Sequence, residues 1–267
     1  MKKLAVLLMV LTSLLFCSCV KLKVSEGTEP VVRLERAEGT DAVSLDLGGG
    51  VMLDLVLIRP GKFMMGSENG ERNEKPVHEV TISQPFYLGK YEVTQAQWEA
   101  VMGSNPSESK GIYLPVECVS WEDCQNFIKK LNSKGVGTFR LPTEAEWEYA
   151  CRAGTTGDQA GKIDEMAWYG KMNEFRKQPV GMKKANPWGL YDMHGNVFEW
   201  CQDWYGDYSQ DKQTDPKGAT DGAGRVIRGG SLYYDADDCR SAYRYPFPVS
   251  PLHRDILLGF RLVREVP

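Results

Sequence analysis

Residues 186–200 read Asn-Pro-Trp-Gly-Leu-Tyr-Asp-Met-His-Gly-Asn-Val-Phe-Glu-Trp. Like the rest of the chain beyond about Gly154, this stretch is rich in Gly, Asp, Trp and Tyr and shows few helical periods. About a hundred residues with little regular structure are unusual in a compact domain. We therefore expect large aromatic side chains to bury the loops of the C-terminal half.

Upstream of Gly154, local signals mark the starts of helices. Thr94 and Gln97 have the spacing of a capping box, in which each side chain bonds the other residue's backbone N–H. Thr143 and Glu146 repeat that spacing. A segment with apolar residues at helical intervals follows Ser120. We therefore predict helices that begin at these positions.

Glu144 and Glu146 lie in the first turn of the last of these helices, where two carboxylates could serve acid–base catalysis. Trp147 and Ala150 share a face of the same helix and should be buried. A cap and surface role is therefore the prediction for both glutamates. Strands are predicted over residues 51–58, 77–82 and 86–91.

The composition is that of an ordinary globular protein. The 267 residues are 42% hydrophobic and 25% charged, with a formal net charge of −4. These values exclude the disordered, collagenous and coiled-coil classes. A mildly acidic chain without a basic run also argues against a nucleic-acid partner, and we expect none. The 7 cysteines are odd in number and lack paired Cys-x-x-Cys spacing, which indicates neither a disulfide framework nor a zinc site.

The N-terminus has the features of a secretion signal. Two lysines precede an apolar run over residues 4–16, which is too short to span a bilayer comfortably. The pair Ser18-Cys19 resembles a bacterial lipobox, so residues 1–18 are predicted to be a lipoprotein signal peptide and Cys19 the lipidated residue. The alternative is a plain secretory signal with an incidental cysteine. We expect the lipid to anchor the protein to a bacterial membrane. The expected membrane is the outer membrane, with the protein facing the cell surface.

Residues 19–50 are predicted to be a tether with at most a strand around residues 31–34. They are charged, poor in aromatic residues, and end in three glycines. One domain is expected from residue 51 to residue 267, and we expect it to be a monomer.

Several long motifs follow in order: Pro-Gly-Lys-Phe-Met-Met-Gly-Ser at 60–67, Tyr-Glu-Val-Thr-Gln at 91–95, Pro-Val-Glu-Cys-Val-Ser-Trp at 115–121, Arg-Leu-Pro-Thr-Glu-Ala-Glu-Trp-Glu-Tyr-Ala at 140–150, the stretch at 186–200, Arg-Gly-Gly-Ser at 228–231 and Gly-Phe-Arg-Leu at 259–262. Together they resemble the formylglycine-generating-enzyme (sulfatase-modifying factor) family. The resemblance implies an α+β protein with that family's C-type-lectin fold: a small antiparallel sheet, flanking helices and much irregular structure.

The resemblance also implies what catalysis would require. The aerobic family enzymes oxidise a substrate cysteine to formylglycine with O₂, using a cysteine pair that binds Cu(I). The first of these cysteines stands at the third position beyond the serine of Gly-Gly-Ser, where this chain has Tyr234. Cys239 is the only thiol in that region, and its aspartate neighbours should raise its pKa. We therefore predict a protein that is not an enzyme and requires no cofactor.

A catalytic member of the family is the alternative, as a copper- or iron-dependent oxidase of extracytoplasmic substrates. The related nonheme-iron members, which join sulfur to histidine derivatives, carry an added His-rich domain. This chain has only His78, His194 and His253, which are too scattered for such a triad. A structural hydrogen bond is the expected role of His194.

The segment from about residue 232 to residue 258 has neither a strand nor a helix period. It resembles the variable region of diversity-generating-retroelement target proteins, in which mutation of an Asn-rich template yields residues such as Tyr, Asp, His, Ile, Leu and Phe. Tyrosine-rich surfaces are also typical of antibody paratopes, so we expect a protein ligand or a host or microbial surface molecule as the partner. The predicted ligand-binding residues are Tyr233, Tyr234, Asp235, Asp237, Asp238, Tyr243, Tyr245, Phe247, His253, Asp255, Ile256 and Leu257.

Packing of the loop core is the alternative role for the tyrosines. It suits Tyr243 better than Tyr233 and Tyr234, because consecutive residues cannot all face inward.

The resemblance finally implies a structural Ca²⁺ site in the turn at 192–199. Asp192 and Glu199 would donate side-chain oxygens, and Gly195 and Val197 would donate backbone carbonyls. In the alternative, Asp192 caps a turn and Glu199 pairs with an arginine or lysine.

Overall fold

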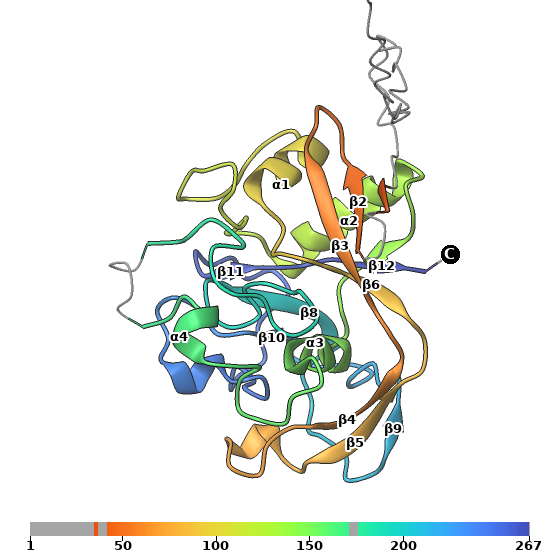
Figure 1. Ribbon diagram of the computed structural model, residues 1–267, viewed down its shortest axis with the longest axis vertical. Coiled ribbons are helices and arrows are strands. Elements are labelled where there is room, and N and C mark those ends of the chain that lie inside the picture. Colours follow the sequence, from red (N-terminus) through yellow and green to blue (C-terminus); the bar gives the residue numbers. More distant parts are fainter. Residues whose placement is uncertain (1–34, 37–41, 171–175, 267) are drawn as a thin grey trace, which may run out of the picture.

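The computed structural model describes residues 35–36, 42–170 and 176–266. The predicted signal peptide and Cys19 lie outside these residues. Strands and helices both occur, joined by long loops, so the predicted α+β class is confirmed (Figure 1). Within the described part of the chain, none of the helices has the length and apolar character needed to cross a bilayer.

The largest sheet brings the two ends of the described chain together. All of its pairings are antiparallel, and the C-terminal strand lies between two strands that come more than a hundred residues earlier in the chain. Two predicted strands are confirmed here, as β3 (Met52–Ile58) and β6 (Phe86–Gly89). In order across the sheet, the strands are β1 (Glu35–Arg36), β2 (Ala42–Asp46), β3 (Met52–Ile58), β6 (Phe86–Gly89), β12 (Val263–Glu265) and β7 (Phe139–Arg140).

The folded chain begins earlier than the sequence analysis predicts. Residues 42–46 were expected to belong to the tether, but they form β2 and pair with β3. Val43, Leu45 and Leu47 are buried, because alternate residues of a strand point to the same face of the sheet. The tether prediction is wrong for this part of the chain.

Two smaller sheets contain three strands each. One consists of β4 (Gly61–Met65), β5 (His78–Ile82) and β9 (Gln213–Thr214), in which β5 is the predicted strand at 77–82. The other consists of β10 (Arg225–Arg228), β8 (Phe198–Trp204) and β11 (Leu258–Gly259). The parallel pairing of β11 with β8 places the end of the 232–258 segment against the stretch at 186–200.

The three predicted helix starts are confirmed. Thr94, Ser120 and Thr143 are the N-caps of capping boxes. Gly103 ends the first helix in the left-handed conformation, with φ of 83°. The helices are α1 (Gln95–Met102), α2 (Trp121–Ser133), α3 (Glu144–Arg152) and the short α4 (Ile163–Met166), with 3₁₀ turns at Arg72–Glu74 and Ala236–Cys239.

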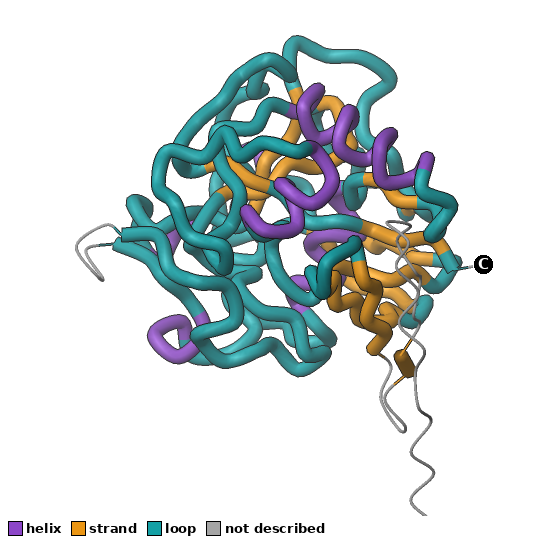
Figure 2. Tube along the Cα trace, turned by 90° about the horizontal axis from the view of Figure 1, so that it is seen from above, coloured by secondary structure: helices purple, strands orange, loops and turns teal. Residues whose placement is uncertain are grey.

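Aromatic side chains bury the loops, as predicted. Trp200 is fully buried, and its Nε1 donates a hydrogen bond of 3.0 Å to the carbonyl of Val119. Trp98 stacks on Phe127 with 5.2 Å between ring centroids, and Phe260 meets both rings edge-on. Because Phe260 follows β11, its contacts pack the connection between β11 and β12 onto α1 and α2. The long loops are drawn in teal in Figure 2.

Candidate ligand-binding surface

Buried arginines join the segment at 232–258 to the rest of the fold. Arg244 Nε lies 2.6 Å from Glu144 Oε1, and Arg244 Nη2 lies 3.0 Å from Glu144 Oε2. Arg228 Nη2, just before the segment, lies 2.5 Å from Glu148 Oε2. All four side chains are buried. Such pairs resist separation, because either partner alone would be an uncompensated buried charge.

Glu144 is therefore not the surface group that was predicted. It is only 3% exposed, and its carboxylate is directed at Arg244, which is far away in sequence. Glu146 does act as a cap: its Oε2 accepts a 2.9 Å hydrogen bond from the Thr143 N–H. It also pairs with Arg140 at 2.6 Å.

Two less buried ion pairs add to this attachment. Arg240 Nη1 lies 2.7 Å from Glu74 Oε2, and Arg254 Nε lies 2.6 Å from Asp123 Oδ2. Asp123 is in the first turn of α2. Each of the arginines between residues 232 and 258 is thus paired with a carboxylate outside the segment.

A pocket of about 300 Å³ opens within the segment's surface. Phe198 of β8, Ile227 of β10 and Leu258 of β11 contribute to its lining. Half of the predicted ligand-binding residues also line it, so the fold brings together residues that are spread over the segment. These are Tyr234, Tyr245, Phe247, His253, Asp255 and Leu257.

The aromatic rings of the pocket contact one another edge-on. Tyr234 and Tyr245 lie 4.9 and 5.6 Å from Phe198, measured between ring centroids. Phe247 lies 6.3 Å from Tyr245 and is 66% exposed. Burial, followed by the neighbouring Tyr245, raises the pKa of Tyr234 to about 12. The Tyr234 phenol is therefore a neutral hydroxyl at physiological pH.

The other predicted residues lie outside the pocket lining. Tyr233, Asp235 and Asp237 are exposed, whereas Asp238 and Ile256 are half-buried. The aspartates belong to the 3₁₀ turn at 236–239 and its cap, next to Tyr234 in the sequence.

Tyr243 does not belong to the binding surface, so its prediction is wrong. It is only 6% exposed and packs in the main hydrophobic core. Burial, followed by the charge of Asp238, raises the pKa of its phenol. The alternative role in loop packing is the correct one for this residue.

Part of the pocket lining was not predicted from the sequence. Phe198 and Ile227 lie on strands outside the predicted segment, and only the pairing of β8 with β10 and β11 brings them to it. The remaining missed residues lie inside or at the end of the segment, where continuity with their neighbours is the available signal. They are Pro248, Val249, Ser250 and Leu258.

Cys239 and Cys151 are buried thiols. Burial, with a smaller contribution from Asp238, raises the pKa of Cys239, in the predicted direction. Burial also raises the pKa of Cys151 to about 12. His194 Nδ1 lies 2.7 Å from the Cys239 carbonyl oxygen, and burial lowers its pKa to about 4, which fits the expected structural hydrogen bond. In the described chain, the cysteines form no disulfide.

The two carboxylates predicted to bind Ca²⁺, Glu199 and Asp192, both accept hydrogen bonds from within the protein. Both oxygens of Glu199 accept hydrogen bonds from Arg261, and Trp147 Nε1 donates to one of them at 2.7 Å. Asp192 Oδ2 accepts from the Gly181 N–H, while its Oδ1 is buried without a hydrogen-bond partner. Among the described residues, no group of three or more His, Cys, Asp and Glu side chains could hold a metal ion. Glu199 therefore matches the arginine-paired alternative, and Ca²⁺ binding stays a prediction.

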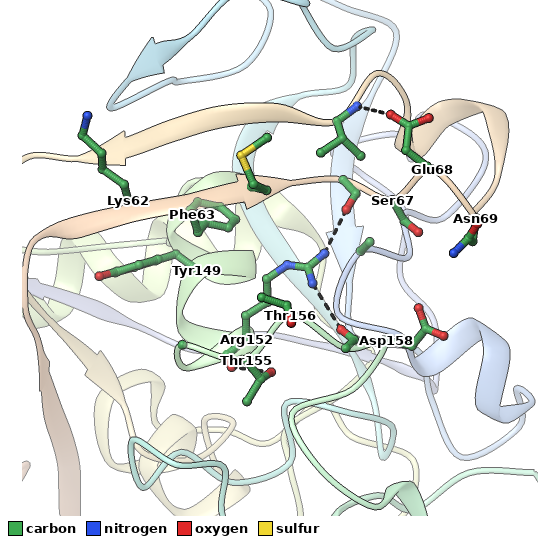
Figure 3. Close-up of a pocket in the computed structure, with 16 residues that line it drawn as sticks. Lys62, Phe63, Ser67, Glu68, Asn69, Tyr149, Arg152, Thr155, Thr156 and Asp158 are labelled. Carbon is green, nitrogen blue, oxygen red and sulfur yellow. Dashed lines mark hydrogen bonds between the residues drawn. The ribbon is translucent and has the colours of Figure 1, made fainter.

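A second cavity, of about 440 Å³, lies beside β4 and the end of α3 (Figure 3). It contains none of the predicted ligand-binding residues. Its Arg152 donates to the carbonyls of Gly66 and Gly157 at 2.9 and 3.3 Å and pairs with Glu148 at 2.8 Å. The Arg152 guanidinium thus connects neighbouring loops, and its hydrogen bonds go to groups of the protein itself.

A family model for the sulfatase-modifying factor enzyme 1-like domain matches residues 51–266, so the chain belongs to this family. The solved structure of Treponema denticola variable protein 1 has a TM-score of 0.78 and is 31% identical, covering 84% of this chain and 99% of that one. The predicted C-type-lectin fold of the formylglycine-generating type is thereby confirmed.

Curated relatives are also similar. The chaperone protein LppX of Paenibacillus barcinonensis is 32% identical, covering 85% of this chain and 95% of LppX. The formylglycine-generating enzyme of Streptomyces coelicolor is 30% identical, covering 82% of this chain and 69% of the enzyme. The chain spans only 35%, 38% and 39% of the length of three chlamydial Pkn1 kinases that it also matches.

Proposed function

We propose that the protein is a non-catalytic lipoprotein, displayed at a bacterial surface, that binds a protein ligand through the segment at 232–258. The pocket is the observation that carries this proposal. Aromatic residues from irregular loops line it, and ion pairs to the scaffold hold those loops. A preorganised aromatic surface gives large contact area at a low entropic cost of ordering. Similarity to a protein named as a variable protein adds support.

Two features of the site support the non-catalytic part of the proposal. Tyr234 stands at the sequence position that the family resemblance gives to the first copper-binding thiolate. Cys239 is buried and its pKa is raised, so it has little of the thiolate character that both a nucleophile and a Cu(I) ligand need.

Selection from a random peptide display library tests the binding function. Peptides selected on the wild-type protein should lose binding to the Tyr234→Ala/Tyr245→Ala/Phe247→Ala variant. Phe247→Ala alone should weaken binding without unfolding, because the ring is largely exposed. Met64→Ala removes another exposed apolar side chain, outside this pocket, and should leave binding unchanged. Selected peptides that bind the triple variant as tightly as the wild type would contradict the site assignment, provided both have the same melting curve.

A formylglycine-generating oxidase is the second candidate, favoured by the 30% identity to the Streptomyces enzyme. The purified protein should consume no O₂ above background when it is given Cu(I) and a cysteine-containing peptide. Turnover that disappears in Cys239→Ser would establish the oxidase instead.

The lipid anchor has its own test in the producing cells. Labelled palmitate should be incorporated into the wild-type protein and not into Cys19→Ser, which should move to the soluble fraction. Protease added to intact cells should digest the anchored protein if it faces outward. Labelling of Cys19→Ser, or full protection in intact cells, would contradict the anchor or the surface display.

A further inference from the structure

We infer that the pocket receives a bulky apolar side chain that stands next to a basic residue in the protein ligand. The inference rests on the proposed binding function and specifies the chemistry of the ligand. It follows from three properties of the pocket: its size, its apolar lining, and the sign of the charge at its edge.

The size and lining favour a single large side chain. A volume of about 300 Å³ is at the lower end of the range for ligand pockets, too small for a folded element. Apolar and aromatic residues dominate the lining, and Phe198, Ile227 and Leu258 come from the paired strands β8, β10 and β11. An aromatic or long aliphatic side chain would bury its surface here and gain edge-on ring contacts.

The charged group of the pocket is Asp255. Its Oδ1 accepts a 2.8 Å hydrogen bond from the Leu257 N–H, which fixes the carboxylate. Its Oδ2 lies 3.9 Å from His253 Nε2, and the Asp255 side chain remains 44% exposed. The described residues that line the pocket include no lysine or arginine.

Among the described residues, the two arginines of the segment that are not fully buried already pair with carboxylates elsewhere. Arg254 and Arg240 are committed to Asp123 and Glu74. The exposed Asp235 and Asp237 add negative charge in the same segment. A basic residue next to the inserted apolar side chain would therefore be attracted, and an acidic one would be repelled.

Blocked dipeptides supply the probes for a direct test by calorimetry or NMR titration at low ionic strength. N-acetyl-Trp-Lys-amide should bind about fivefold more tightly than N-acetyl-Trp-Glu-amide, and more tightly than N-acetyl-Ala-Lys-amide. Asp255→Asn keeps an oxygen for the Leu257 N–H, so it should fold normally. It should bring the Lys-to-Glu affinity ratio close to one while the preference for Trp over Ala remains. Asp211→Asn removes an exposed carboxylate near β9 and should keep the wild-type ratio.

Several outcomes would overturn the inference. Equal or tighter binding of the Trp-Glu probe would do so, as would an unchanged affinity ratio in Asp255→Asn. If no dipeptide binds, the peptides from the display selection decide between the two proposals. Selected peptides that need Phe247 for binding but contain no apolar residue next to a basic one would refute the inferred ligand chemistry. They would still support the proposed binding function. Selected peptides that do not depend on the pocket at all would refute the binding function itself.

Discussion

Among single residues, Asp203 should make the stability of the folded protein depend on pH. Burial, followed by the charge of Glu144, raises the pKa of the Asp203 carboxyl group from 3.8 to about 8. The folded state therefore binds the proton more tightly than the unfolded state. Its contribution to stability is complete below about pH 4 and is lost as the pH rises to about 8. Asp203→Asn should be more stable than the wild type at pH 9, by at least about 1 kcal/mol, the equivalent of one pKa unit.

Urea unfolding between pH 5 and pH 9 measures this effect. The wild type should lose stability across the range more steeply than Asp203→Asn. Asp211→Asn is the control, because its side chain is exposed, and it should follow the wild-type curve. Parallel curves for the wild type and Asp203→Asn would show that Asp203 does not hold its proton in the folded state.

How far the sequence predicts a residue's role depends on where its partners lie. The raised pKa of Cys239 was predicted in direction because Asp238 is adjacent to it, although burial proves to be the larger cause. Glu144 was misassigned because its partner Arg244 reaches it only through the tertiary fold. Tyr243 was misassigned for the same reason, since it packs into a core built from distant strands.

At the scale of elements, the arginines that hold the segment at 232–258 should differ in their contribution to stability. Arg244→Ala would leave Glu144 buried beside one fewer cation, and we expect a loss of about 3–5 kcal/mol. Arg254 is largely exposed where it pairs with Asp123, so Arg254→Ala should cost at most about 1 kcal/mol. Chemical denaturation measures both values, and equal losses would contradict this account of how the segment is held.

The elements themselves were predictable where their signals are local. The capping boxes of α1, α2 and α3 each lie within four residues, and all three helix starts are confirmed. The alternating Val43, Leu45 and Leu47 offered a strand signal for β2, but the charged composition around them favoured the tether interpretation. The pocket was predicted only in part, because pairing between β8, β10 and β11 brings its distant residues together.

At the scale of the whole molecule, the largest sheet joins the first described strands to the last one. β2 pairs with one edge of β3, and β6 pairs with the other edge. The irregular half, with the pocket, is attached to this sheet through β12 and β7 and through shared aromatic packing. The family resemblance predicted this architecture, whereas composition alone could exclude only other classes.

This arrangement predicts what a chain that starts at Val51 would do. It would lose β2 and with it the burial of Val43, Leu45 and Leu47, each of which contributes about 1.5–3 kcal/mol when fully buried. It would also expose the edge of β3, which can pair with another copy of the chain. We therefore expect a lower melting temperature and concentration-dependent association in sedimentation. A chain that starts at Glu35 keeps β2 and should match the full-length protein. If both truncated chains melt alike and remain monomeric, residues 42–47 are a tether after all.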